Sequence, residues 1–200
     1  MLEKDMFLKN KYIFLTLFFI FIIKSSLASE RNNLTNVIDH LSNLNNFSVS
    51  FLQNNNQEIS EGKISIGNKR VRVDYKTPTK ILIILDKDKA MYYNYDLDED
   101  EFFNPKETSA WFFFEIFNNL NFLLDSEIKT KEKNIILRKE GLANNEKYTL
   151  KIYLENKPIL LRKVELILEN EKMTLSFFDH NYNENFPLKF FKLINPTFFN

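Results

Sequence analysis

The sequence predicts a mainly β fold in which a strongly apolar helix covers an antiparallel sheet. The first observation is a long series of short segments whose side chains alternate between apolar and polar. The second is the segment Asn104–Leu124, "NPKETSAWFFFEIFNNLNFLL", which carries the only Trp of the chain and five Phe. The third is the absence of Cys, so hydrophobic packing and not disulfide bonds must hold the domain together.

The segment of residues 1–28 has the pattern of a signal peptide. Three lysines precede the run Tyr12–Ile23, whose twelve residues are apolar except for one Thr. This length suits a signal-peptide core and falls short of the roughly 20 residues that span a bilayer as a helix. Ser26 and Ala28 fit the small-residue rule for cleavage after Ala28, with an uncleaved membrane anchor as the alternative. We expect an exported protein with a single domain at residues 29–200.

Charge and composition narrow the function classes. Without residues 1–28, the chain has 172 residues with 23 basic and 25 acidic side chains. This near-neutral balance argues against binding to nucleic acid and against strong adsorption to anionic membranes. Because there is no Cys, the mature chain has no site for lipid attachment at an N-terminal cysteine. We expect a free monomer in an envelope compartment.

The first element of the domain is predicted to be an amphipathic helix. Its apolar residues recur with the helical period of 3.6, at positions Leu34, Val37, Ile38, Leu41 and Leu44. Either Asn32 or Asn33 is a suitable residue for the start of this helix, because an Asn side chain can accept a hydrogen bond from the first free N–H groups.

From Phe47 onward the hydrophobic period changes to two, which predicts strands. We expect them at residues 46–53, 69–76, 80–86, 90–96, 134–139, 147–156, 160–170 and 172–179. Short polar turns and clean alternation are typical of an antiparallel sheet with one wet face. The residues expected to face a cavity on these strands are Phe47, Val49, Phe51, Val71, Val73 and Tyr75. Those expected to face solvent are Arg70, Arg72 and Asp74.

The aromatic segment is predicted to be a helix with apolar residues on every side. Ser109 is a suitable cap, Pro105 lies shortly upstream, and Glu115 is the only charge between Ala110 and Leu120. A helix of this kind must be enclosed by protein, membrane or ligand. One alternative is an ordinary core helix, and the other is a helix that closes a groove for acyl chains. In the second case Trp111, Phe114 and Phe117 are the candidate contacts.

Catalytic and metal-binding patterns are weak. His40 falls between the apolar positions of the first helix, and His180 is expected in a solvated turn. There is no nucleophile elbow, Gly-rich phosphate loop or Cys nucleophile. The run Asp96–Glu107 places acids as a calcium loop does, but Glu101 stands where that loop needs Gly. We therefore expect no enzyme activity, no cofactor and no metal site.

Several short motifs follow one another along the chain. They are Phe51-Leu52-Gln53, the alternation of Gly62, Ile64 and Ile66, the set Arg72, Asp74, Tyr75 and Pro78, the aliphatic run "ILIILD" (81–86), the aromatic run "YYNYD" (92–96) and the close "FFKLINPTFF" (190–199). In this order the set resembles the periplasmic carriers of outer-membrane lipoproteins, the LolA-type family.

The resemblance implies an unclosed β-barrel with a helical lid over a hydrophobic cavity. Such a carrier shields the acyl chains of a lipoprotein in the periplasm, between an inner-membrane ATP-driven exporter and the outer membrane, where some systems have a receptor. It implies that the cargo contacts are Phe47, Val49, Phe51, Val71, Val73, Tyr75, Trp111, Phe114 and Phe117. The alternative is a regulatory module of the same fold that senses mislocalised lipoproteins.

The sequence departs from the family pattern at two turns. Carriers commonly have Arg-Pro before the third strand, with the Arg as a latch for the lid, whereas here Gly67 and Asn68 stand at those positions. A latch would therefore have to come from Lys69, Arg70 or another residue. The Asp-Gly turn that is common after the aliphatic strand is replaced by the run Asp86–Lys89.

Overall fold

The computed structural model describes residues 33–55, 58–169 and 171–199. The expected signal peptide at residues 1–28, its cleavage site and the candidate cap Asn32 lie outside these residues. Within the described ranges, no helix is both long enough and apolar enough to cross a bilayer.

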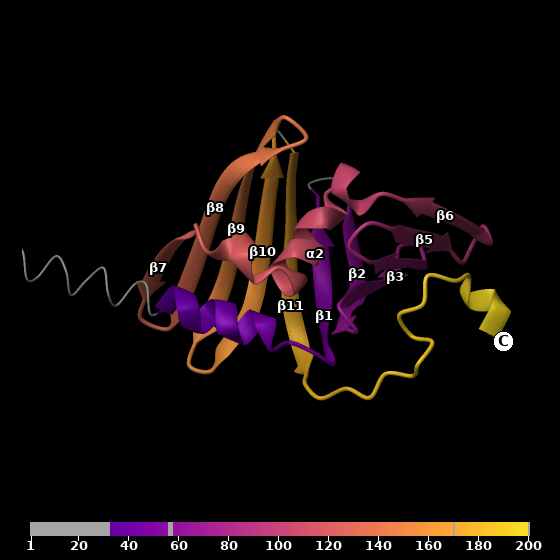
Figure 1. The fold of residues 1–200 in the computed structure, drawn as a ribbon, viewed down its shortest axis with the longest axis horizontal. Coiled ribbons are helices and arrows are strands. Elements are labelled where there is room, and N and C mark those ends of the chain that lie inside the picture. Colours follow the sequence, from indigo (N-terminus) through magenta and orange to yellow (C-terminus); the bar gives the residue numbers. More distant parts are fainter. Residues whose placement is uncertain (1–32, 56–57, 170, 200) are drawn as a thin grey trace, which may run out of the picture.

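The fold is built on one antiparallel sheet of 11 strands, in the order β6-β5-β4-β3-β2-β1-β11-β10-β9-β8-β7 (Figure 1). The strands are β1 (Phe47–Asn54), β2 (Ile59–Gly67), β3 (Arg70–Thr77), β4 (Ile81–Leu85), β5 (Ala90–Asn94), β6 (Glu99–Phe103), β7 (Glu127–Lys131), β8 (Asn134–Ala143), β9 (Glu146–Asn156), β10 (Ile159–Leu168) and β11 (Glu171–Asn181). The pairing of β1 with β11 joins the two halves of the sheet, and β6 and β7 are left at opposite ends. The predicted class, an unclosed antiparallel β-barrel with helices over it, is confirmed.

Two helical segments lie across one face of this sheet (Figure 1). The first comprises residues 33–42, and the second is α2 (Ala110–Asn118), between the short 3-10 helices η1 (Pro105–Glu107) and η2 (Leu120–Leu123). Buried side chains of both helices and of the sheet form one hydrophobic cluster. The first helix contributes Val37, Ile38 and Leu41, as its period predicts.

The connection from β6 to β7 explains where α2 lies. These two strands are consecutive in the chain but stand at opposite ends of the sheet. The residues between them must therefore cross the sheet, and α2 is the central part of that crossing (Figure 1). Neither β6 nor β7 is predicted from the sequence, because both are short and mostly charged. Charged residues on short edge strands also discourage pairing with other chains.

The start of α2 differs from the predicted cap. Ser109 occupies the N-cap position, but its backbone is helical and its side chain makes no capping hydrogen bond. Instead, the Oγ1 of Thr108 accepts a hydrogen bond from the N–H of Ala110 at 3.3 Å. Upstream, the side chain of Asn104 caps η1 by accepting from the N–H of Lys106. The aromatic segment is therefore held by two successive short caps.

The prediction of a sheet with one wet face is wrong for β4 and β5. On their outer face Leu82, Ile84, Met91 and Tyr93 form a second buried cluster, against which Leu193 of the C-terminal segment packs. This segment, which we define as residues 182–199, ends in the 3-10 helix η3 (Pro196–Phe199). These strands are therefore buried on both faces, and their near-continuous apolar sequence is the consequence.

Arg70 and Arg72 point to the outer face, as predicted, but solvent is not their main contact. Arg70 donates to the carbonyl of Phe191 at 3.0 Å, and Arg72 donates to the carbonyl of Phe190 at 2.8 Å. The Arg72 guanidinium also lies 4.2 Å from the centre of the Phe190 ring and forms an ion pair with Asp74 at 2.7 Å. The two arginines attach the C-terminal segment to β3.

The residues of the first three sequence motifs meet where β1, β2 and β3 lie side by side. The ring of Phe51 lies edge-to-face with that of Tyr75 at 5.3 Å, and the Tyr75 hydroxyl donates to the side-chain oxygen of Gln53 at 2.8 Å. A Cβ at Gly62 would stand 2.5 Å from the backbone oxygen of Asp74 and 2.6 Å from the Phe51 ring. Gly62 is therefore required by close packing, and these motifs maintain the fold.

We predict that Gly62→Ala lowers the free energy of unfolding by about 1–3 kcal/mol, because the added methyl group must displace a neighbouring strand or the buried Phe51 ring. Urea denaturation of both proteins measures the difference. The matched control is Gly141→Ala, whose Cβ would have its three nearest atoms in the side chain of Tyr148 and none in the backbone. Equal losses in the two variants would contradict the explanation.

A second prediction concerns stability at high pH. Burial raises the pKa of the Tyr75 hydroxyl to about 12, above the value of about 10 expected in the unfolded chain. The folded protein therefore disfavours the ionised form. Stability due to Tyr75 is intact below pH 10 and is lost between pH 10 and 12, at up to about 1.4 kcal/mol per pH unit. In urea denaturation series the decline should be smaller for Tyr75→Phe, and an identical decline in both proteins would refute this assignment.

Candidate functional site

The interior between the sheet and α2 brings together every residue that the sequence analysis proposed as a contact. Seven are buried members of the main hydrophobic cluster, namely Phe47, Val49, Phe51, Val71, Val73, Phe114 and Phe117. Tyr75 and Trp111 are partly buried and pack against the same cluster. Side chains from β1 and β3 thus meet those of α2 from the opposite wall.

The helix fills this interior with aromatic rings. Its buried residues are Phe112, Phe113, Phe114, Ile116 and Phe117. Phe112 lies edge-to-face with Tyr148 of β9 at 4.7 Å, and Trp111 lies edge-to-face with Phe122 of η2 at 5.3 Å. Apolar side chains on nearly every side of α2 are therefore accommodated between the sheet and the segments beside the helix.

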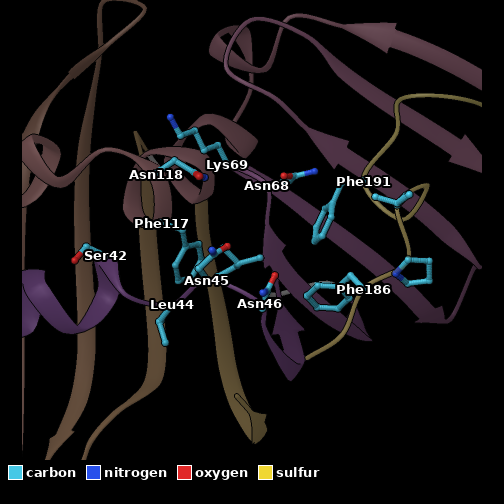
Figure 2. Close-up of a pocket in the computed structure, with 13 residues that line it drawn as sticks. Ser42, Leu44, Asn45, Asn46, Asn68, Lys69, Phe117, Asn118, Phe186 and Phe191 are labelled. Atoms are coloured by element: carbon cyan, nitrogen blue, oxygen red, sulfur yellow. The ribbon is translucent and has the colours of Figure 1, made fainter. Parts of the chain in front are cut away.

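A groove of about 820 Å³ opens beside the end of α2 (Figure 2). It lies where the end of the first helix, the turn between β2 and β3, the end of α2 and the C-terminal segment come together. Its floor includes Leu44, Ile66 and Phe117, which are also buried members of the main cluster. The groove is thus a place where the interior reaches the surface.

The rim of this groove is polar and almost uncharged. The polar residues that line it are Ser42, Asn45, Asn46, Asn68, Lys69 and Asn118 (Figure 2). Phe186, Pro187, Leu188 and Phe191 of the C-terminal segment form another wall. Of the cargo contacts proposed from the sequence, only Phe117 lines the groove. Most of the other lining residues lie at the ends of elements or in turns and loops, where no hydrophobic period marks a common surface.

The turn before β3 does not carry the Arg that the family resemblance leads us to expect as a latch for the lid. A Cβ at Gly67 would stand 2.8 Å from the ring of Phe191, so the missing side chain makes room for the C-terminal segment. Arg70 forms an ion pair with Asp86 at 2.7 Å and binds the Phe191 carbonyl, so it is held on the outer face. Lys69 lies at the groove rim and forms no ion pair with the described residues.

The two histidines lie near each other but form no catalytic arrangement with the other described residues. His180 lies in β11 and not in the expected turn, and its Nε2 is 2.7 Å from the carbonyl oxygen of Leu161. Burial lowers the pKa of His40, and the nearby His180 lowers it further.

The acidic run resembling a calcium loop forms the turn before β6 and the strand itself, and Asp98 accepts a hydrogen bond from Tyr93 at 2.7 Å. Among the described residues, no group of three or more His, Cys, Asp or Glu side chains could hold a metal ion.

Solved structures with a similar fold are distant in sequence. An uncharacterised conserved protein from Thermus thermophilus has a TM-score of 0.54 at 7% identity, with 80% of this chain and 92% of that chain covered. LprF from Mycobacterium bovis has a TM-score of 0.45 at 10% identity, with 80% and 96% covered. MucB, solved in complex with MucA(peri), has a TM-score of 0.45 at 12% identity, with 80% and 58% covered. A comparison with curated proteins gives no match.

The sequence itself matches a family model over residues 42–194, which is most of the chain. The model is described as outer membrane lipoprotein carrier protein LolA. The match agrees with the order of the sequence motifs and with the open antiparallel sheet crossed by an apolar helix. The family is one of carriers and not of enzymes. The chain belongs to the LolA family of outer membrane lipoprotein carrier proteins.

Proposed function

We propose that this protein is a periplasmic carrier that binds the acyl chains of lipoproteins between its sheet and α2. It takes its cargo from an inner-membrane ATP-driven exporter and delivers it to the outer membrane, directly or through a receptor. The family match and the apolar interior support this role. In this proposal residues 1–28 are a cleaved signal peptide and residues 29–200 are one carrier domain.

The observation that carries the proposal is the apolar surface of α2 against the open sheet. A helix with five buried apolar residues in nine requires apolar surroundings on most sides. Acyl chains would offer α2 the same surroundings as the sheet does. Each buried CH₂ contributes about 0.8 kcal/mol, so even partial burial of three acyl chains holds cargo firmly.

Release follows from competition between cargo and the helix. In the empty protein the rings of Phe114 and Phe117 already occupy the interior. Cargo must displace them, so the cost of their displacement lowers the net affinity for acyl chains. A carrier that gives up its cargo benefits from this competition, whereas a permanent binder would not. The proposed contacts on the sheet side are Phe47, Val49, Phe51, Val71, Val73 and Tyr75.

We predict that at least one of the variants Trp111→Ala, Phe114→Ala and Phe117→Ala impairs cargo binding more than it impairs folding. Removal of a buried Phe from an ordinary core costs about 3–5 kcal/mol. At least one of the three variants should cost clearly less, because that ring, once displaced, packs on the acyl chains of the cargo and not only on permanent neighbours in the core. Thermal unfolding and the binding of a triacylated lipopeptide are measured for each variant.

The matched control is Ile84→Ala, which removes a buried side chain from the outer cluster beneath the C-terminal segment. This variant should lose about 2–5 kcal/mol of stability while its folded fraction binds lipopeptide normally. If all three α2 variants behave like this control, the helix is an ordinary core element and the proposal fails.

A direct test of the cargo is to purify the protein from its native envelope without detergent. Mass spectrometry of the purified material should detect triacylated lipoprotein in stoichiometric amounts. Detection of phospholipid alone would indicate a general lipid carrier and would contradict the proposed cargo.

A further inference from the structure

The groove beside the end of α2 has a structure that the binding of acyl chains does not explain. Leu44, Ile66 and Phe117 connect its floor to the interior. Its rim, in contrast, carries amide side chains, which gain nothing from contact with hydrocarbon. A ligand that fits both must have an apolar part inside and a hydrogen-bonding part at the surface.

We infer that the rim of this groove binds the extended peptide that follows the lipid-modified residue of the cargo. This inference rests on the proposed function, and it adds a second, polar subsite to the apolar interior. The acyl chains would lie inside, and the polypeptide would leave the carrier along the asparagine rim.

The chemistry of the rim matches a peptide backbone. Each Asn side chain offers two N–H donors and one acceptor oxygen, which are the groups that an extended backbone needs as partners. Asn45, Asn46 and Asn68 are exposed, and their side chains make no hydrogen bond with the other described residues. They are therefore available to a ligand. Asn118 is partly engaged, because it donates to the carbonyl of Phe114 at 3.2 Å.

Backbone conformation accounts for the residue type at two of these positions. Asn46 and Asn68 have φ values of 54° and 56°, in the left-handed region that favours Asn. The turns thus favour Asn or Gly there, but the side chain of Gly would offer no hydrogen bonds to a ligand. Asn45 has no such backbone requirement. Its exposed amide contributes to the rim and makes no hydrogen bond with the other described residues.

The charge of the groove favours a peptide over a lipid headgroup. Among the residues that the structure describes, Lys69 is the only charged one that lines it, and no acid does. Recognition of a phosphate normally uses several cationic donors or the fork of an arginine. A rim of neutral amides with one lysine lacks that arrangement. Its volume of about 820 Å³ is within the usual range for ligand sites, which reaches about 1,000 Å³.

The test compares three probes in isothermal titration calorimetry. The first is triacylated cysteine amide, which has acyl chains but no peptide. The second carries the same lipid on a cysteine followed by five Ser, Asn and Ala residues. The third is a diacyl phospholipid. The wild-type protein should bind the second probe roughly five- to tenfold more tightly than the first, as one or two additional hydrogen bonds would provide.

The variant is Asn45→Ala combined with Asn68→Gly, because Gly keeps the left-handed backbone at residue 68. It should bind the peptide-bearing probe no more tightly than the cysteine amide, with the affinity for the amide unchanged. The matched control is Asn145→Gly, which replaces an exposed Asn with a φ of 69° in the turn between β8 and β9, away from the groove. This control should bind all three probes as the wild type does.

Three results would overturn the inference. Equal affinity of the wild type for the first two probes would show that the peptide gains nothing. Equal loss for both probes in the double variant would assign the rim to the lipid or the fold. A loss for the phospholipid as large as that for the peptide would assign it to a headgroup. In each case the proposed carrier function stands, whereas failure of both acylated cysteine probes to bind the wild type would refute that function as well.

Discussion

The packing of α2 against one face of the sheet is the interaction on which the rest of the structure depends. An open sheet of 11 strands leaves its first and last strands far apart, and the chain must pass from β6 to β7 across the face between them. Because the crossing segment is aromatic, it covers the apolar faces of β1, β3 and β9 instead of exposing them to water. The same packing that closes the fold also occupies the space proposed for cargo.

The outer face of the sheet also has apolar residues that must be covered, and a different segment covers them. β4 and β5 are apolar on both faces, and the helices cover only one of them. The C-terminal segment covers the other, attached by Arg70 and Arg72 through carbonyl oxygens and by Phe191 over Gly67. Since the same segment forms a wall of the groove, the outer cover and the opening of the interior are parts of one continuous structure.

The features that could be predicted from the sequence are those that follow from the regular spacing of apolar residues along a single helix or strand. Alternation along β1 and β3 places Phe51 and Val73 inside and Arg72 outside, and the structure agrees. The groove could not be predicted in this way, because Asn45, Asn68 and Phe186 come from three separate turns and loops. The edge strands β6 and β7 were missed because their charged residues give no apolar alternation. The cover over β4 was missed because the period of a strand does not reveal which distant segment packs on it.

Trp111 provides the most direct test of the central claim, that α2 occupies the interior and yields to acyl chains. It is the only tryptophan of the chain, it lies on α2, and it packs against Phe112 and Phe122. Its fluorescence and its quenching by acrylamide therefore report on the position of this helix. Saturation with a triacylated lipopeptide should shift its emission and change its quenching markedly, because the ring leaves Phe122 when α2 moves. Tight binding of the lipopeptide with both signals unchanged would show that α2 does not move, and would contradict the account.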